Sequence, residues 1–304
     1  MTVGRFAPSP SGSLHLGSLR TALLAWCAAR HERGRFLVRM EDLTTGAAPV
    51  REREQLEDLA MLGLHHDGPV VRQSERTHLY DAAIDRLTAS GLTYPCYCSR
   101  REIREAAAAP HGPPTGTYPG TCRDLTDAAR RARERDGRRP ALRLRAGGEV
   151  VGFVDRLVGE HEAEVDDFVL RRADGVAAYN LAVVVDDADQ GVDQVVRGDD
   201  LVPTTPRQVL LQRLLGLPTP EYLHVPLVLG PDGERLAKRH GAVGLGDRLA
   251  AGDTPEGVIG MLAASLDLAE PGERLTADEV LERFDPDRIP TRPWVLDPSD
   301  LPAG

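Results

Sequence analysis

The hydrophobic residues in the first third of the chain follow two alternating patterns, short continuous runs and helical spacing. Apolar runs at Val3–Ala7 and Phe36–Met40 are typical of buried strands, whereas His15–Arg33 carries apolar residues at helical intervals. Helical spacing returns over Val50–Leu62 and Leu79–Ser90. Alternating strands and helices predict an α/β fold with a doubly wound parallel sheet, whose ligands lie at the carboxyl ends of the strands.

The pattern changes over residues 93–172, which we interpret as an insertion into this domain. Ala- and Arg-rich helical stretches flank a Pro/Gly-rich loop at His111–Gly120, and strand-like pieces follow at Ala141–Arg145 and Val150–Val154.

Sheet-like runs resume after residue 172. We expect strands at Leu181–Val185, Gln194–Arg197 and Tyr222–Leu229, with a helix over Thr205–Leu214. These segments complete the second half of the predicted α/β domain.

The tail, from about residue 249, has helical spacing with two marked starts. Thr254 precedes Pro255 at a first helical position, and Thr276 with Glu279 forms a capping-box pattern. The predicted organisation is a first half-domain at 1–92, an insertion at 93–172, a second half-domain at 173–248 and a short helical segment at 249–304.

The composition is that of an ordinary globular protein, with 41% hydrophobic and 28% charged residues. The N-terminus has no signal-like segment and no apolar run is long enough to span a bilayer, so we expect a cytoplasmic monomer without a membrane partner. A net charge of -10 argues against a general basic coat for nucleic acid. Taken one at a time, Arg-rich runs such as Arg100–Arg104 and Arg123–Arg139 are most simply interpreted as solvated helix faces. As a set they are also compatible with a local phosphate-binding surface.

Two motifs far apart in the chain carry the candidate chemistry. The first, RFAPSPSGSLHLGS from Arg5 to Ser18, runs from a strand through a Pro/Ser/Gly turn into a helix. Such a turn points free N–H groups and the positive end of the helix dipole at an anion. The second, GERLAKR from Gly233 to Arg239, places flexible cations on a loop, as is needed to neutralise a polyphosphate. Either motif alone is also compatible with a plain connector.

Together the two motifs resemble the HIGH and KMSKS signatures of class I aminoacyl-tRNA synthetases, and the first resembles the glutamyl branch specifically. The resemblance implies that a carboxylate attacks the α-phosphate of ATP and pyrophosphate leaves, with His15 and Lys238 as catalytic residues and Mg²⁺ as a cofactor. The implied ATP-binding residues are His15, Gly17, Ser18, Arg235, Leu236 and Lys238. The chain departs from the signatures at Ser18, which replaces the last His, at Arg235, which replaces the first Lys, and at Ala237, which replaces the Ser.

Glutamate has two carboxylates and one ammonium, so its pocket needs paired cations and one acid. Arg5 and Arg197 can supply bidentate forks, Glu41 can bind the ammonium and Tyr179 can add a hydroxyl. An ion pair between Arg197 and a following acid, Asp199 or Asp200, is the alternative interpretation of that arginine. The family resemblance implies a glutamate-binding set of Arg5, Phe6, Ala7, Pro8, Ser9, Glu41, Tyr179 and Arg197; Thr44 departs from the family, which often has Asp there.

Three of the four cysteines, Cys96, Cys98 and Cys122, lie close together in the sequence, whereas Cys27 falls in an apolar helical run. This clustering favours a metal site over a disulfide framework in a reducing compartment. Zinc prefers four ligands, and the residues alone leave His111 and Tyr118 as near-equal candidates for the fourth. The shortened glutamyl family carries a Cys-x-Cys…Tyr-x-x-x-Cys zinc cluster, and this resemblance implies Tyr118 and a structural Zn²⁺.

A full glutamyl-tRNA synthetase continues past its KMSKS loop with helical domains that grip the anticodon, and we expect too little sequence after Lys238 for them. The chain therefore resembles the truncated family of glutamyl-queuosine tRNA(Asp) synthetases. That resemblance implies ATP-dependent activation of L-glutamate without tRNA, then transfer to queuosine in the anticodon of tRNA(Asp). The alternatives are a glutamyl-tRNA synthetase fragment, a small-molecule glutamyl ligase and a non-catalytic tRNA-binding paralogue. A mere binder has no need to retain His15, Lys238 and the glutamate-pocket residues.

Overall fold

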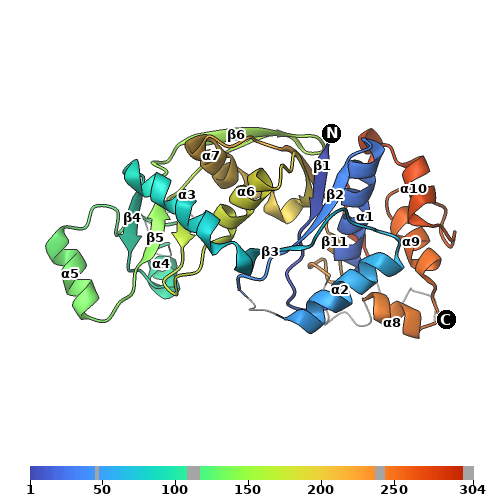
Figure 1. Ribbon diagram of the computed structural model, residues 1–304, viewed down its shortest axis with the longest axis horizontal. Coiled ribbons are helices and arrows are strands. Elements are labelled where there is room, and N and C mark those ends of the chain that lie inside the picture. Colours follow the sequence, from blue (N-terminus) through green and yellow to red (C-terminus); the bar gives the residue numbers. More distant parts are fainter. Residues whose placement is uncertain (45–47, 108–116, 237–243, 297–304) are drawn as a thin grey trace.

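A seven-stranded sheet runs through the middle of the molecule in the computed structural model, which describes residues 1–44, 48–107, 117–236 and 244–296 (Figure 1). The strand order is β3-β2-β1-β9-β10-β6-β7, and every neighbouring pair is parallel except the β6–β7 hairpin. The strands are β1 (Val3–Phe6), β2 (Arg35–Met40), β3 (Val71–Arg72), β6 (Val150–Asp155), β7 (Gly159–Glu164), β9 (Gln194–Gly198) and β10 (Glu221–Val225). The predicted α/β class with a mainly parallel sheet is confirmed.

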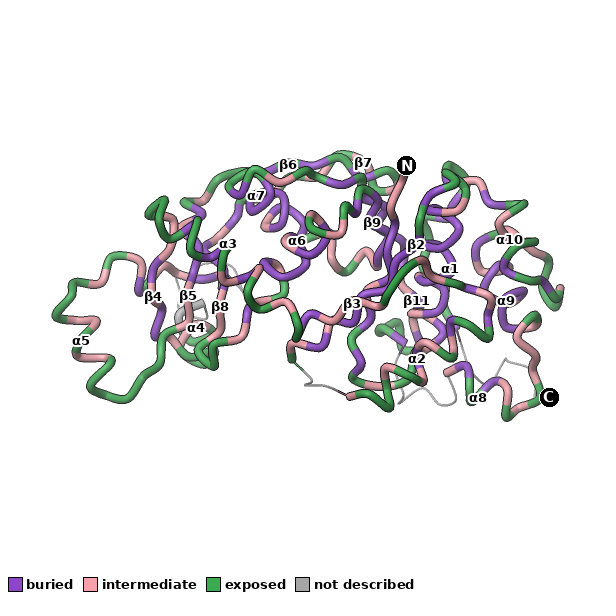
Figure 2. The backbone as a smooth tube through the Cα atoms, in the orientation of Figure 1, coloured by how far each residue is buried: buried purple, intermediate pink, exposed green. Residues whose placement is uncertain are grey.

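Helices cover both faces of this sheet, as a doubly wound fold requires. One face packs against α1 (Leu16–His31), which is covered in turn by α9 (Pro255–Ala264) and α10 (Ala277–Arg283). The other face packs against α6 (Tyr179–Asp189) and α7 (Thr205–Leu215), with α3 (Thr77–Ala89) against them. The central strands are accordingly buried along most of their length (Figure 2).

Strand alternation decides which side chains face which layer. In β2, Phe36 and Val38 enter the core beneath α1, whereas Leu37 points to the α6 side. Arg39 shares the parity of Leu37 and is fully buried on that same side, where it meets α6. The register pairs Arg5 of β1 with Leu37 of β2, so Arg5 also faces the α6 side. The α6 face of the sheet therefore collects buried charged side chains, whereas the α1 face is mainly apolar, with the amide of Gln194 as a buried polar group.

A second, three-stranded antiparallel sheet lies at the opposite end of the molecule from the C-terminal helices (Figure 1). It consists of β4 (Thr93–Cys96), β5 (Ala141–Leu144) and β8 (Val169–Arg171), with α4 (Arg100–Ala107) and the largely exposed α5 (Asp127–Arg135) beside it (Figure 2). All of these elements belong to residues 93–172, but β6 and β7 from the same segment extend the main sheet. The domain boundaries predicted above stay predictions.

Two predicted strands were wrong. Leu181–Val185 belongs to α6, because a short apolar run fits a buried helix as well as a buried strand. Here the run is buried in a core that α6 shares with the sheet, α3 and α7. The predicted strand Tyr222–Leu229 divides at Pro226 into β10 and β11 (Val228–Leu229), since proline has no N–H for a sheet ladder. β11 pairs instead with β12 (Trp294–Val295).

The remaining helices are short connecting elements and the helix that follows β2. α2 (Pro49–Met61) follows β2, and α8 (Leu245–Ala250) precedes α9; short 3₁₀ helices occur at Gln73–Glu75, Asp199–Thr204 and Pro286–Arg288. The capping box at α10 is confirmed, because the Thr276 N–H donates to the Glu279 carboxylate and the Glu279 N–H donates to the Thr276 hydroxyl. No helix in the described part of the chain is both long and apolar enough to cross a membrane.

Gly260 of α9 provides a test of this packing. A Cβ at Gly260 would lie 1.7 Å from the carbonyl oxygen of Glu273, whereas a Cβ at Gly257 of the same helix would meet nothing closer than 3.6 Å. We expect Gly260→Ala to lower the free energy of unfolding by about 1–3 kcal/mol through overpacking. The matched Gly257→Ala should not lower it, because alanine is the better helix former. Equal effects of the two substitutions in a denaturant titration would contradict this packing.

Candidate functional site

A cleft of about 770 Å³ opens at the carboxyl ends of β1, β2 and β9. Every residue predicted to bind glutamate or ATP lines this cleft, with the single exception of Lys238, which lies outside the described residues. The N-terminal motif forms one wall and Glu234, Arg235 and Leu236 of the second motif form part of another. The structure therefore brings the described parts of the two distant motifs to one site.

Backbone pairing explains why the second motif returns to the first. The Leu236 N–H donates to the Val228 carbonyl at 2.9 Å, which folds the chain back along β11. Beyond the undescribed residues 237–243, Gly244 forms an isolated β-bridge with His15. Both ends of the segment that contains Lys238 are thus held beside the N-terminal motif.

The turn between β1 and α1 is anchored from two directions. His15 caps α1, with its Nδ1 accepting the Ser18 N–H at 3.1 Å. The side-chain amide of Gln55 in α2 donates to the carbonyls of Ser9 and Gly12 at 3.0 and 2.7 Å. Sequence reasoning missed Gln55; its only signal was an uncharged amide among the charged residues of α2, and the structure shows that this amide is buried. The turn consequently keeps an open concave face at the helix N-terminus.

Gly17 is required beside His15. A Cβ at Gly17 would lie 3.1 Å from two ring atoms of His15 and 3.3 Å from Val228. A larger residue would push the imidazole out of its capping position. This close approach accounts for a glycine in the first turn of a helix, where glycine is otherwise unfavourable.

His15 is a neutral group in this site. Burial, together with the nearby positive charge of Arg235, lowers the pKa of His15 from 6.5 to about 4. Because Nδ1 accepts the Ser18 N–H, the ring proton sits on Nε2, which lies 3.2 Å from the Ser18 hydroxyl. His15 can therefore offer a hydrogen-bond donor to a phosphate without a formal charge.

A buried ion network ties the amino-acid end of the cleft to α6. Arg5 donates through Nε to Asp187 at 3.4 Å and through Nη1 to the Val196 carbonyl at 3.2 Å. Arg39 bridges Asp187 at 2.7 Å and Glu41 at 3.2 Å. Burial raises the pKa of Glu41 even though the charges of Arg39 and Arg5 oppose that rise. The network fixes Arg5 and Glu41 while leaving both on the cleft wall.

Sequence reasoning did not single out Arg39 or its acidic partners. Asp187 accepts from both arginines, and the neighbouring Asp186 accepts from Gln73, Arg76 and Tyr80. The available signal was a charged residue inside the apolar run Phe36–Met40, because arginine is almost never fully buried unless it is paired.

Arg197 is a buried cation whose hydrogen-bond partners are all neutral. It donates through Nε to His224 at 3.0 Å, through Nη1 to Gln208 at 2.8 Å and through Nη2 to Thr205 at 2.8 Å. Among the described residues no carboxylate lies within ion-pair distance of it, and only 5% of its surface is exposed. The alternative ion pair with Asp199 or Asp200 is not formed. A buried, unneutralised guanidinium beside an open cleft favours an anionic ligand.

The carboxylate that sequence reasoning offered to Arg197 has another partner. Asp200 pairs with Arg235 of the second motif at 2.8 Å, so this ion pair closes one side of the cleft. Tyr179, at the first position of α6, lies on the cleft wall, and 39% of the residue is exposed.

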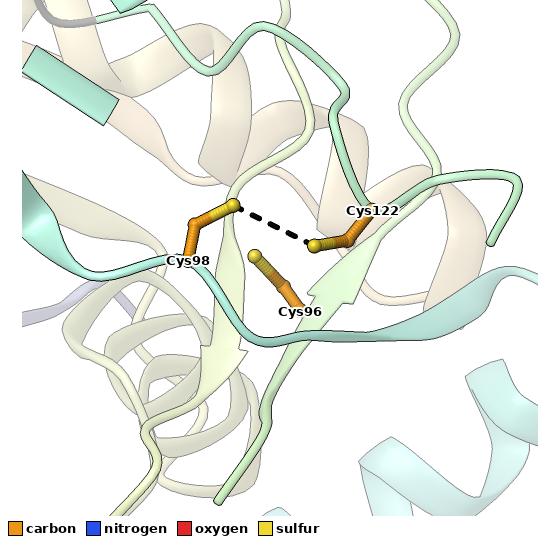
Figure 3. A group of neighbouring side chains, drawn as sticks. All are labelled: Cys96, Cys98 and Cys122. Atoms are coloured by element: carbon orange, nitrogen blue, oxygen red, sulfur yellow. Dashed lines mark hydrogen bonds between the residues drawn. The ribbon is translucent and has the colours of Figure 1, made fainter. Parts of the chain in front are cut away.

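The three clustered cysteines converge in space, and their Sγ atoms all lie within 4.8 Å of one another (Figure 3). Cys98 and Cys122 are 3.5 Å apart, and the Tyr118 hydroxyl lies 3.3 Å from the sulfur of Cys96. Zinc–sulfur bonds of ~2.3 Å in a tetrahedron place sulfurs roughly 3.8 Å apart, so the donor set fits a zinc ion. His111 lies outside the described residues. Cys27 is buried in α1, away from this cluster.

Comparison with known proteins places these features in a family. The family described as tRNA synthetases class I (E and Q), catalytic domain, matches residues 1–302. A protein of Nocardia farcinica named glutamyl-Q tRNA(Asp) synthetase is 59% identical over 298 residues, covering 98% of this chain and 94% of the relative. One of the same name from Symbiobacterium thermophilum is 50% identical over 307 residues, covering 96% and 95%.

A solved structure agrees with the fold. The crystal structure of a glutamate tRNA ligase from Elizabethkingia meningosepticum in complex with its amino acid superposes with a TM-score of 0.81 at 26% identity. The match covers 97% of this chain and 66% of that chain.

The protonation state of His15 can be measured directly. We expect its ring resonances in NMR spectra to stay constant from pH 8 to about pH 5.5, because the folded protein holds the ring neutral until about pH 4. The unfolded chain binds this proton near pH 6.5, so the contribution of His15 to folding stability is lost progressively as pH falls from 6.5 towards 4.

Among the nine histidines, His15→Gln identifies the resonance. Arg235→Ala should raise the pKa of His15, since it removes the nearby positive charge but not the burial. Titration of the wild-type ring near pH 6.5 would contradict the neutral state.

Proposed function

Because the chain belongs to the class I tRNA synthetases for glutamate and glutamine, we propose that it activates L-glutamate with ATP and transfers it to queuosine in the anticodon of tRNA(Asp). Family membership makes the chain a ligase. The observation that carries the proposal for glutamate is the pair of buried arginines, Arg5 and Arg197, on a cleft wall that also presents Glu41. The names of the most similar relatives support the queuosine acceptor.

The charges of the site match those of glutamate. Arg197 has neutral partners only among the described residues, so a substrate carboxylate would supply its counter-charge. Arg5 would bind through the part of its guanidinium not engaged by Asp187 and the Val196 carbonyl. Glu41 would accept the substrate ammonium. Tyr179 would add a hydroxyl, and the wall from Phe6 to Ser9 would enclose the side chain.

The nucleotide end would use the helix N-terminus and the second motif. A glutamate carboxylate oxygen would attack the α-phosphorus of ATP as the bond to pyrophosphate breaks. His15 would donate from Nε2 to the developing negative charge, while Gly17, Ser18, Arg235 and Leu236 would surround the phosphates and Lys238 would add a cation. Mg²⁺ would enter with the ATP phosphates and neutralise part of their charge. Loss of one such donor costs ~3–4 kcal/mol of barrier.

A structural zinc ion is the second part of the proposal. Cys96, Cys98 and Cys122 would hold it, with the Tyr118 oxygen as the fourth ligand. Four protein ligands leave no open position, so the ion would cross-link the end of β4 to the segment around Tyr118 and take no part in the reaction.

The decisive experiment is glutamate-dependent ATP–pyrophosphate exchange by the purified protein without RNA, followed by transfer of labelled glutamate to tRNA(Asp) with and without queuosine. We expect exchange without tRNA and transfer only to the queuosine-containing tRNA. Lys238→Ala should reduce exchange by about 10²–10³ while leaving the fold intact. Absence of exchange would overturn the proposal.

Two other outcomes of this experiment would support the alternative functions. Charging of the 3′ end of tRNA(Glu) would indicate a glutamyl-tRNA synthetase activity. Exchange without transfer to any tRNA would indicate a small-molecule glutamyl ligase.

Metal analysis tests the zinc site. We expect about one zinc per chain, its loss in Cys122→Ser, and its retention in Cys27→Ala, which alters a cysteine outside the cluster. Tyr118→Phe should weaken zinc binding, whereas His111→Ala should not. The reverse pattern for these last two variants would make His111 the fourth ligand.

A further inference from the structure

A chain of buried polar groups extends behind Arg197 across three adjacent strands of the main sheet. Asp155 ends β6, His224 lies on β10 and Arg197 lies on β9, and His224 is the register partner of Arg197. Asp155 Oδ2 is 2.6 Å from His224 Nδ1, and Arg197 Nε is 3.0 Å from His224 Nε2. Asp155 and His224 are both buried, and neither lines the cleft.

The environment of Asp155 fixes the tautomer of His224. Oδ1 accepts the backbone N–H groups of Leu157 and Val158, both at 2.9 Å, and Oδ2 accepts the backbone N–H of His224 at 2.9 Å. Burial opposes ionisation, but the hydrogen bonds from His224 and these amides hold the pKa of Asp155 below its usual range. An ionised Asp155 can only accept, so His224 must donate from Nδ1, which leaves Nε2 as an acceptor.

We propose that His224, held in its Nδ1–H form by Asp155, is a positioning residue that orients Arg197 for the carboxylate of the amino-acid substrate. The inference rests on the proposed function, which assigns Arg197 to glutamate. A neutral acceptor suits this task, because it fixes the Nε end of the guanidinium without neutralising the charge. A carboxylate at the same place would compete with the substrate for that charge. Asp155 would thus influence glutamate binding without contacting glutamate.

Three substitutions separate this role from simple packing. His224→Asn keeps a donor near the Nδ1 position for Asp155 but loses the acceptor for Arg197. His224→Gln places an amide oxygen near the Nε2 position and so restores that acceptor. Asp155→Asn keeps shape and volume. Because two backbone N–H groups need an oxygen at Oδ1, its NH₂ would take the place of Oδ2, where it loses the hydrogen bond from the His224 backbone N–H and faces Nδ1, so that the ring proton is forced onto Nε2, against Arg197.

The readout is the KM for glutamate against the KM for ATP in pyrophosphate exchange, with thermal stability measured alongside. We expect His224→Asn and Asp155→Asn to raise the KM for glutamate about tenfold, the equivalent of one charge-assisted hydrogen bond, with the KM for ATP nearly unchanged. His224→Gln should recover most of the loss. Leu223→Ala is the matched control: it lies on the same strand but faces the apolar α1 core, so it should lower stability without shifting the KM for glutamate.

Unchanged glutamate KM in Asp155→Asn, or a parallel rise in the KM for ATP, would overturn the inference. If the His224 variants do not fold, Asp155→Asn alone decides, because it preserves volume. Absence of glutamate-dependent exchange in the wild-type protein would be a different result, which overturns the proposed function and removes the premise of this inference.

Discussion

Burial of charge on one face of the main sheet is the constraint on which the rest of the site depends. An ion taken from water costs several kcal/mol unless its partners are close and well oriented. Arg39, with no exposed surface, meets this requirement through Asp187 and Glu41, and Asp187 also accepts from Arg5. The charges of Arg39 and Arg5 outweigh burial and keep the pKa of Asp187 below its usual range. Relative displacement of β1, β2 or α6 would leave buried charges unpaired, so the network fixes the amino-acid end of the cleft.

The sequence was sufficient to predict those parts of the site that lie within one continuous segment of the chain. The N-terminal motif predicts a strand, a turn and a helix start within one continuous segment, and the structure forms β1, the turn and the His15 cap there. Glu41 could likewise be placed at a strand end, because it directly follows the apolar run of β2. The cysteine spacing predicted a cluster for the same reason, although two of its members are separated from the third by the undescribed residues 108–116.

The sequence was insufficient where the answer depends on distant pairing. Leu181–Val185 is apolar enough for either a strand or a helix, and only its packing between sheet and α3 decides for the helix. The same misassignment concealed Asp187, because its burial against Arg39 follows from the helical spacing of α6. β6 lies within the predicted insertion, and its last residue, Asp155, contacts His224 in the main sheet. None of these relations has a local signal in the chain.

The two ends of the cleft differ in their electrostatics: His15 is neutral at the nucleotide end, whereas Arg197 at the amino-acid end is a cation that forms no ion pair with any described residue. At the nucleotide end burial, aided by the positive charge of Arg235, lowers the pKa of His15 and keeps it neutral, so the helix N-terminus carries no additional fixed cation. At the amino-acid end Arg197 is a cation with neutral partners. This arrangement lowers folding stability, because no counter-charge in the described part of the chain compensates the desolvation of the buried ion. Such a cost is expected at a binding site, where an anionic ligand supplies the missing counter-charge. The nearby acids of the protein pair with other groups. Asp187 pairs with Arg5 and Arg39, and Asp200 pairs with Arg235. Asp155 is linked to Arg197 only through the neutral imidazole of His224.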